Sequence, residues 1–107
     1  GIYFDTGKSD IKENSAKELN EVVKYLKNNP EVNLYIVGHT DDSGNLDNNL
    51  KLSNDRAQAV LLFLVEKGID KSRLEAHGVA SFAPMSTNDN EEGRQLNRRV
   101  ELVKRIK

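Results

Sequence analysis

The chain has 107 residues, which is enough for one domain with a single modest hydrophobic core. Its 16 Lys and Arg nearly balance its 17 Asp and Glu, and the net charge of −1 argues against a nucleic-acid partner, because domains that bind polyanions usually carry a basic surface. The absence of cysteine excludes disulfides and thiolate metal sites, and no apolar run approaches the roughly 20 residues of a membrane-spanning helix.

The first part of the chain contains three predicted elements. A short strand covers residues 2–4, and a helix follows from Ser15, because Ser15 and Glu18 form the Ser-x-x-Glu pattern of a capping box and apolar residues then recur at helical spacing. This helix should end before Pro30, since the residue before a proline avoids helical geometry. The β-branched residues over positions 32–37 predict the next strand.

The second part of the chain begins with a loop and a longer helix. Turn residues fill positions 41–45, and the helix is expected to start between Asp47 and Ser53 and to end at Gly68. A strand, a loop and a final strand are predicted over residues 73–78, 79–92 and 99–106, respectively.

The order of these elements, β-α-β-α-β-β, predicts an α+β fold. Strands joined through helices should lie parallel, with right-handed crossovers. In the final strand Val100, Leu102 and Ile106 alternate with charged residues, which is typical of a strand with one exposed face that can join a sheet antiparallel. We therefore expect a mixed sheet with both helices packed on one face, a fold that supports many functions.

Two opposite charges stand out between Gly38 and Ala57. Asp41 follows the second predicted strand directly, and Arg56 lies fifteen positions later in the second predicted helix. An arginine offers a planar set of donors to a carboxylate, and an aspartate offers acceptors to an ammonium. If the helix already runs at Asn49, then Asn49, Leu52 and Arg56 share one of its faces. A ligand that carries an ammonium and a carboxylate on one carbon would complement both charges.

Each of these residues also has a simpler interpretation. Asp41 alone is typical of a turn residue that bonds its own backbone, and Arg56 alone is typical of a solvated helix charge. A metal site of His39, Asp41, Asp42 and His77 is disfavoured by the spacing, and His39 is expected to bond neighbouring backbone instead. A hydrolase is disfavoured because no serine has a candidate base at a telling spacing.

The sequence resembles the OmpA-like domain, the peptidoglycan-binding module at the C-terminus of OmpA-type outer-membrane proteins. Related modules occur in the peptidoglycan-associated lipoprotein and in the flagellar stator protein MotB. The matching pieces are, in order, Tyr3-Phe4-Asp5, Gly38-His39-Thr40-Asp41 with Gly44, Asn49, Leu52-Ser53 with Arg56-Ala57, residues 78–84, and Asn97-Arg98-Arg99-Val100.

The resemblance implies a non-catalytic domain without a cofactor that binds peptidoglycan and so anchors the outer membrane or an envelope protein to the cell wall. Residues 1–107 would form a single domain, the C-terminal part of a longer protein, on the periplasmic side and tethered to the outer membrane through an upstream segment. The alternative is a protein-interaction or dimerisation module of an envelope or stator-type assembly, with a weak homodimer.

The resemblance also implies the ligand and the residues that hold it. Asp41 would accept hydrogen bonds from the α-ammonium of diaminopimelate in the stem peptide, and Arg56 would bind its α-carboxylate with two parallel hydrogen bonds. Strand alternation points Arg98 and Arg99 to opposite faces, and we assign Arg99 to the ligand and Arg98 to an ion pair or the surface. The other residues assigned to the groove are Asp5, Thr6, Thr40, Asn49 and Leu52.

Overall fold

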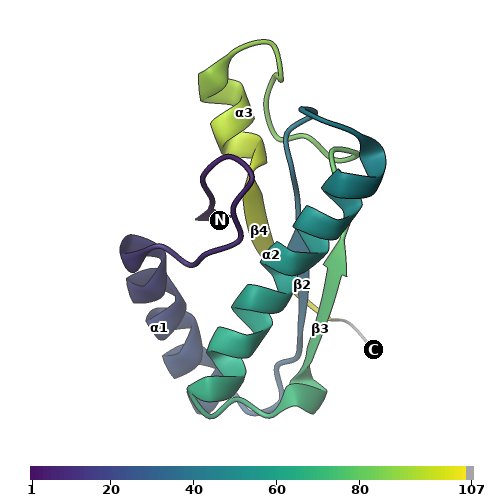
Figure 1. Cartoon of the computed structure of the whole chain (residues 1–107). Helices are drawn as coiled ribbons and strands as arrows, with labels where there is room; N and C mark the ends of the chain where they lie inside the picture. The colour runs from purple at the N-terminus through teal and green to yellow at the C-terminus, as the bar shows by residue number, and fades with distance from the viewer. Residues whose placement is uncertain (106–107) are drawn as a thin grey trace.

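The computed structural model describes residues 1–105, which form a four-stranded sheet and three α-helices (Figure 1). In chain order the elements are β1 (Ile2–Tyr3), α1 (Glu13–Asn28), β2 (Leu34–Gly38), α2 (Leu46–Glu66), the 3₁₀ turn η1 (Lys71–Arg73), β3 (Leu74–Gly78), α3 (Glu91–Asn97) and β4 (Arg99–Lys104). In this part of the chain no helix is both long enough and apolar enough to cross a membrane.

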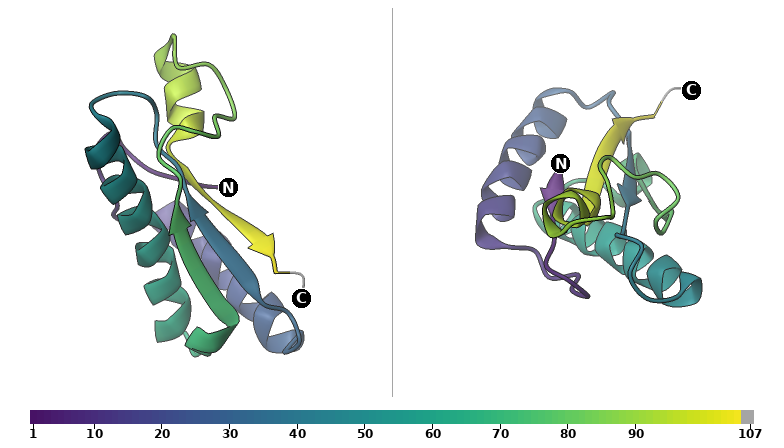
Figure 2. Two further views of the ribbon diagram at one scale, coloured as in Figure 1. Left: turned by 90° about the vertical axis from the view of Figure 1, so that its right-hand side faces the viewer. Right: turned by 90° about the horizontal axis from the view of Figure 1, so that it is seen from above.

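The strands form one mixed sheet in the order β1-β4-β2-β3. β2 and β3, which α2 connects, pair in parallel, and β4 lies antiparallel between β1 and β2. Both long helices cover the same face of this sheet, and α3 stands at one end of it (Figure 2). The predicted α+β class, the mixed sheet and the placement of the helices on one face are confirmed.

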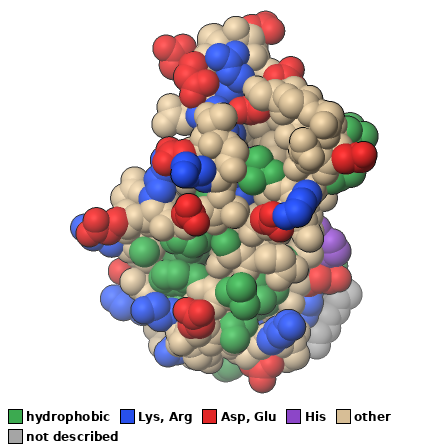
Figure 3. All heavy atoms as spheres, viewed as in Figure 1, with side chains coloured by type: hydrophobic (Ala, Val, Ile, Leu, Met, Phe, Trp, Pro, Cys, Tyr) green, Lys and Arg blue, Asp and Glu red, His purple; other side chains and the backbone are tan. Residues whose placement is uncertain are grey.

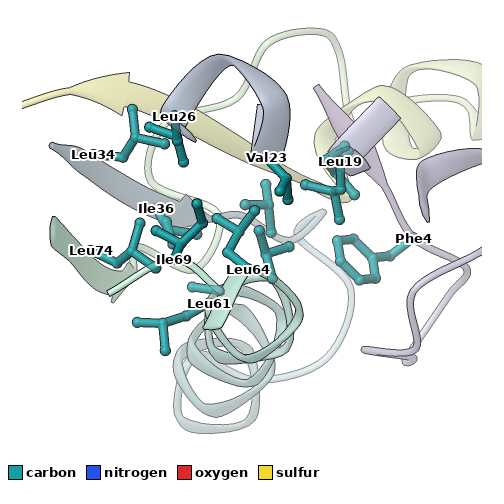
Figure 4. Close-up of a cluster of buried hydrophobic side chains, with 14 residues drawn as sticks. Phe4, Leu19, Val23, Leu26, Leu34, Ile36, Leu61, Leu64, Ile69 and Leu74 are labelled. Carbon is teal, nitrogen blue, oxygen red and sulfur yellow. The ribbon is translucent and has the colours of Figure 1, made fainter. Parts of the chain in front are cut away.

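The hydrophobic core fills the space between the helices and the sheet (Figure 4). Its residues come from both helices and from β2, β3 and β4, at the periodicity of each element. The inward residues of α1 and α2 are buried, and the shared core consists of Leu19, Val23, Leu26, Leu34, Ile36, Ala57, Val60, Leu61, Leu64, Leu74 and Val100, together with Ile2, Phe4 and Ile69. On the helix-covered side, charges of both signs are interspersed with apolar side chains (Figure 3).

Two glycines bring α2 close to the sheet. A Cβ atom on Gly38 would overlap the carbonyl oxygen of Ser53, and one on Gly78 would overlap the backbone nitrogen of Asn54. Because neither strand carries a side chain at these positions, the helix backbone can lie directly against the carboxyl ends of β2 and β3. This contact places the first half of α2 beside the loop that leaves β2.

The boundaries of both long helices differ from the predictions. α1 begins at Glu13, and Ser15 lies buried within its first turn, where its N–H bonds the side chain of Asn14, so the predicted capping box is wrong. α2 begins at Leu46, one residue before the predicted window, because Asn45 caps it through the N–H of Asn48.

The ends of two other elements can be compared as well. Gly68, with φ of +100°, ends α2 as predicted, and its N–H bonds the carbonyl of Val65. The predicted loop over residues 79–92 continues into the unpredicted α3, whose N-cap Asn90 accepts from the N–H of Gly93. β4 follows its prediction to Lys104, while the prediction for Ile106 lies outside the described residues.

Candidate functional site

A cavity of about 380 Å³ opens where the loop after β2 meets the first half of α2. The loop contributes Thr40, Asp41, Ser43 and Gly44. The helix contributes Asn48, Asn49, Lys51, Leu52, Asp55 and Arg56, and the lining is completed by Gly7 and Arg98. Five of the eight residues assigned to the groove from the sequence therefore line it: Thr40, Asp41, Asn49, Leu52 and Arg56.

Asp41 is a buried carboxylate with a partner on each oxygen. Its Oδ1 accepts from the N–H of Ser43 at 2.9 Å, and its Oδ2 accepts from Nη1 of Arg98 at 3.0 Å. Burial alone would raise the pKa of Asp41, but these two donors hold that pKa below its usual value. The Ser43 contact confirms that Asp41 bonds its own turn, and the Arg98 contact adds a buried ion pair.

Arg56 is completely buried, which contradicts its simpler interpretation as a solvated helix charge. Its Nε donates to the carbonyl of Lys8 at 2.8 Å, Nη1 to that of His39 at 3.0 Å and Nη2 to that of Asp5 at 3.0 Å. Burial and the nearby Arg98 lower the pKa of Arg56 to about 10, so the side chain stays charged at neutral pH. These bonds use one of the two N–H groups on each terminal nitrogen, and the residue lines the cavity.

Arg98 lines the cavity, whereas Arg99, which we assigned to the groove from the sequence, does not. Its Nε donates to the carbonyl of Phe4 at 3.2 Å, and its two terminal nitrogens bind Asp41 and, at 2.7 Å, Glu91 of α3. Arg99 lies on the other side of the sheet, bonded to Glu101 and to the carbonyl of Ala83, and does not line the cavity. Arg98 therefore replaces Arg99 in the groove, and the ion pair expected of Arg98 is confirmed.

The residues from the loop after β1 contribute backbone rather than side chains. The Asp5 carboxylate pairs with Lys12 at 2.9 Å, whereas its carbonyl binds Arg56. Thr6 is exposed in a turn, and the cavity lining includes its neighbour Gly7 instead. Asp5 and Thr6 thus lie beside the cavity, but their side chains do not form its wall.

Two further polar side chains lie in the cavity wall, the amide of Asn49 and the hydroxyl of Thr40. Nδ2 of Asn49 donates to the carbonyl of Ser43 at 3.0 Å, which folds the loop onto α2. The hydroxyl of Thr40 is buried and, within residues 1–105, has no hydrogen-bond partner.

His39 and His77 do not form a joint site. Both ring nitrogens of His39 are buried and lack a hydrogen-bond partner within the described chain, so its expected bond to neighbouring backbone is wrong. Burial lowers the pKa of His39. His77 is exposed and lies 3.3 Å from the Glu75 carboxylate. Among residues 1–105 no group of three or more potential ligands could hold a metal ion.

Some lining residues could have been found from the sequence. Helical spacing from Leu52 identifies the part of the cavity wall that α2 contributes, because i, i+4 and i+7 spacing relates Asn48, Leu52 and Asp55. Lys51, one turn from Asp55, pairs with it at 2.9 Å. Arg98 shares strand parity with Val100, whose side chain is buried beneath the helices. That parity points Arg98, not Arg99, to the side of the sheet that carries α2.

Comparison with known proteins agrees with the resemblance. The OmpA family matches residues 3–98 of the chain. The probable lipoprotein YiaD of Escherichia coli is 35% identical over 95% of this chain and 47% of its own length, and outer membrane porin F of Pseudomonas aeruginosa is 40% identical over 94% of the chain and 29% of its own length. The chain thus spans half or less of these two relatives.

A solved structure has the same fold. The peptidoglycan-associated lipoprotein of Burkholderia pseudomallei superposes with a TM-score of 0.94 at 30% identity, over 97% of this chain and 88% of the other. The family match covers almost the whole chain, from the second residue of β1 through α3, and ends directly before β4. The chain belongs to the OmpA family.

Proposed function

We propose that this domain binds peptidoglycan without catalysis, through the diaminopimelate residue of the stem peptide. We also propose that residues 1–107 are the C-terminal part of a longer envelope protein, on the periplasmic side, which the domain anchors to the cell wall. One observation carries the proposal: a buried carboxylate, Asp41, and a buried guanidinium, Arg56, stand in the wall of one cavity. The names of two similar proteins, a peptidoglycan-associated lipoprotein and an outer membrane porin, support it.

The charges in the cavity complement a ligand that carries an ammonium and a carboxylate on one carbon atom. Each oxygen of Asp41 accepts one hydrogen bond from the protein and keeps a lone pair for an ammonium. Arg56 keeps one N–H on each terminal nitrogen for a carboxylate. Both groups are already desolvated and fixed by bonds to backbone and to Arg98, so little side-chain entropy is lost on binding.

The same charges favour diaminopimelate over lysine in the third position of the stem peptide. Lysine has the ammonium but lacks the second carboxylate, so it would leave the free N–H groups of Arg56 buried beneath the ligand. Leaving a buried charge without its partner costs roughly 2–5 kcal/mol. Because three backbone carbonyls already satisfy Arg56, we expect the lower end, about 2 kcal/mol or roughly 30-fold in affinity.

The affinity of one site should be modest. The cavity holds only a small part of a stem peptide, and binding must offset the lost freedom of the ligand, so a Kd between roughly micromolar and millimolar is expected. A polymeric wall and a tethered protein would raise the effective affinity through repeated rebinding.

The test is a titration monitored by chemical shifts with a diaminopimelate muropeptide and its lysine counterpart. We expect only the first to shift Thr40, Asp41 and Asn49, and Asp41→Asn to abolish that response. Asp42→Asn is the matched control, since Asp42 is exposed in the same turn and does not line the cavity. Equal binding of both peptides, or unchanged binding by Asp41→Asn, would show that the charge pair does not select the ligand.

The dimerisation module stays the alternative prediction. An elution volume that shifts with protein concentration, together with no response to either muropeptide, would favour it over cell-wall anchoring. The proposal also excludes turnover, so both muropeptides should be recovered unchanged after incubation with the domain.

A further inference from the structure

The part of the cavity wall that α2 contributes changes from buried to exposed across the helix. Asn49 and Arg56 lie buried on its deep side. On the side nearer solvent, Asn48 and Lys51 are exposed and Asp55 is half-buried. Asn48, Lys51 and Asp55 follow one another at i, i+3 and i+7, so they form one strip along the helix. A ligand bound at Arg56 therefore has a charged strip of the same helix beside its outer part.

Three cations line the cavity, and they differ in how far the protein uses their donors. Arg98 binds one carbonyl and two carboxylates, and Arg56 binds three carbonyls. Lys51 makes a single hydrogen bond within residues 1–105, from Nζ to Oδ2 of Asp55 at 2.9 Å. An ammonium has three N–H donors, so this bond uses only one of them.

The pair of Lys51 and Asp55 is one that a ligand can disturb at little cost. The side chain of Lys51 is 78% exposed and that of Asp55 is 44% exposed, and ion pairs so open to water contribute little to stability. The lysine also precedes the aspartate at i, i+4, which is the weaker order of the two in a helix. The ammonium of Lys51 can therefore turn toward an anionic group in the cavity without losing a strong contact.

The stem peptide offers such an anionic group in two places besides the carbon that Asp41 and Arg56 would hold. One is the carboxylate at its C-terminal end. The other is the α-carboxylate of the γ-linked glutamyl residue next to diaminopimelate, which is free because the chain continues through the side-chain carboxyl. Either carboxylate loses its charge when it is converted to an amide, and an amide is a much weaker partner for an ammonium.

We propose that Lys51 binds a second carboxylate of the stem peptide, so that the domain distinguishes a free stem peptide from an amidated one. This contact rests on the proposed function, because Asp41 and Arg56 must first place the peptide in the cavity. A lysine on an exposed helix surface is ordinarily only solvated. Lys51 differs from Lys24, an exposed lysine of α1 that also pairs with a carboxylate, because Lys51 stands in the cavity wall.

The test measures the affinity of the tripeptide alanyl-γ-glutamyl-diaminopimelate and of two derivatives, each with one of these carboxylates converted to an amide. For the parent protein we expect one amide to bind about two- to fivefold more weakly than the free tripeptide, which is the range of an exposed ion pair. Lys51→Met should weaken binding of the free tripeptide by the same factor and should not respond to that amide, because substitution and amidation remove the same contact. The amide that weakens binding identifies the carboxylate that Lys51 holds.

Two variants separate this contact from a general effect of surface charge. Lys24→Met is the matched control, because Lys24 pairs with Glu21 at 3.5 Å on α1 and lies outside the cavity wall, so its affinities should equal those of the parent. Asp55→Asn should bind the free tripeptide about twofold more tightly, because Lys51 loses its competing acceptor and a like charge leaves the ligand's side.

The outcomes distinguish this inference from the proposed function. Equal affinities of the free and amidated tripeptides, still abolished by Asp41→Asn, would overturn the role of Lys51 and leave the proposed function standing. An amide effect that persists in Lys51→Met would also overturn that role. Absence of binding by every tripeptide would overturn the proposed function and the role of Lys51 together.

Discussion

The buried ion pair between Arg98 and Asp41 permits a quantitative prediction. Arg98→Met keeps most of the side-chain volume but removes the donor 3.0 Å from the Asp41 carboxylate, and both side chains are less than a tenth exposed. Removing one partner of a buried pair typically costs 3–5 kcal/mol, because the other charge stays buried. Asp41 keeps the N–H of Ser43, and the lost contact with the exposed Glu91 contributes at most about 1 kcal/mol, so we expect a loss of about 3–4 kcal/mol at pH 7.

The cost should depend on pH with a definite sign. In the parent protein the pKa of Asp41 is held below its usual value, so its contribution to stability is present at neutral pH and is lost as pH falls through the folded-state pKa. In Arg98→Met, burial without the guanidinium should raise that pKa, so the variant recovers stability as the carboxylate is protonated. The difference between the two proteins should therefore shrink from pH 7 to pH 3.

Urea denaturation followed by circular dichroism at both pH values measures this difference. Lys51→Met is the control, because Lys51 is exposed, its partner Asp55 is half-exposed, and such a surface pair contributes at most about 1 kcal/mol. A cost below about 1 kcal/mol for Arg98→Met at pH 7, or an equal cost at both pH values, would refute the argument that Asp41 depends on Arg98.

Three further substitutions test other parts of the structure. Arg56→Lys cannot reproduce three carbonyl bonds from one planar group and should lower stability by about 2–3 kcal/mol in the same urea assay, with unchanged stability refuting the assigned bonds. Gly38→Ala should lower stability by more than about 2 kcal/mol, because its Cβ would overlap Ser53. Gly44→Ala, at a φ of +81° but in open space, should cost only about 1 kcal/mol. Equal costs would contradict the close approach of α2 to the sheet. The pKa of buried His39 is lowered in the folded protein, so the unfolded chain takes up a proton first as pH falls below about 6.5. The stability of the folded state should therefore decline toward pH 5. Thermal denaturation of His39→Phe should show a smaller decline over the same pH range.

Local patterns were sufficient to predict most of the fold. The alternation in β4, the apolar stripe of α2 and the stop at Gly68 depend on neighbours within a few residues, and the structure contains all three. α3 was missed because it has only seven residues and takes its stability from Asn90 and from Gly93, which packs against Thr87. Ser15 matched a capping pattern, but α1 begins two residues earlier, at Glu13, and Ser15 lies buried within its first turn.

The two charged residues of the site could be predicted from the sequence, but their hydrogen-bond partners could not. Asp41 and Arg56 could be selected because their chemistry and spacing are visible in the sequence. The partners of Arg56 are carbonyls of residues 5, 8 and 39, which any residue type can supply, so no side-chain pattern records them. The assignment of Arg99 instead of Arg98 was avoidable, because Arg98 shares the parity of Val100, which lies on the side of the sheet that the helices cover.

The arginine–carbonyl bonds directly after β1 have a mechanical consequence for the proposed anchoring function. Arg98 holds the carbonyl of Phe4, and Arg56 holds those of Asp5 and Lys8, so the chain just after β1 is fastened to the two cations of the cavity. Under the proposed anchoring, tension between a bound wall polymer and the start of the chain would load these few bonds directly. The force would also run along β1, where it shears the contacts with β4 together instead of peeling them apart one by one.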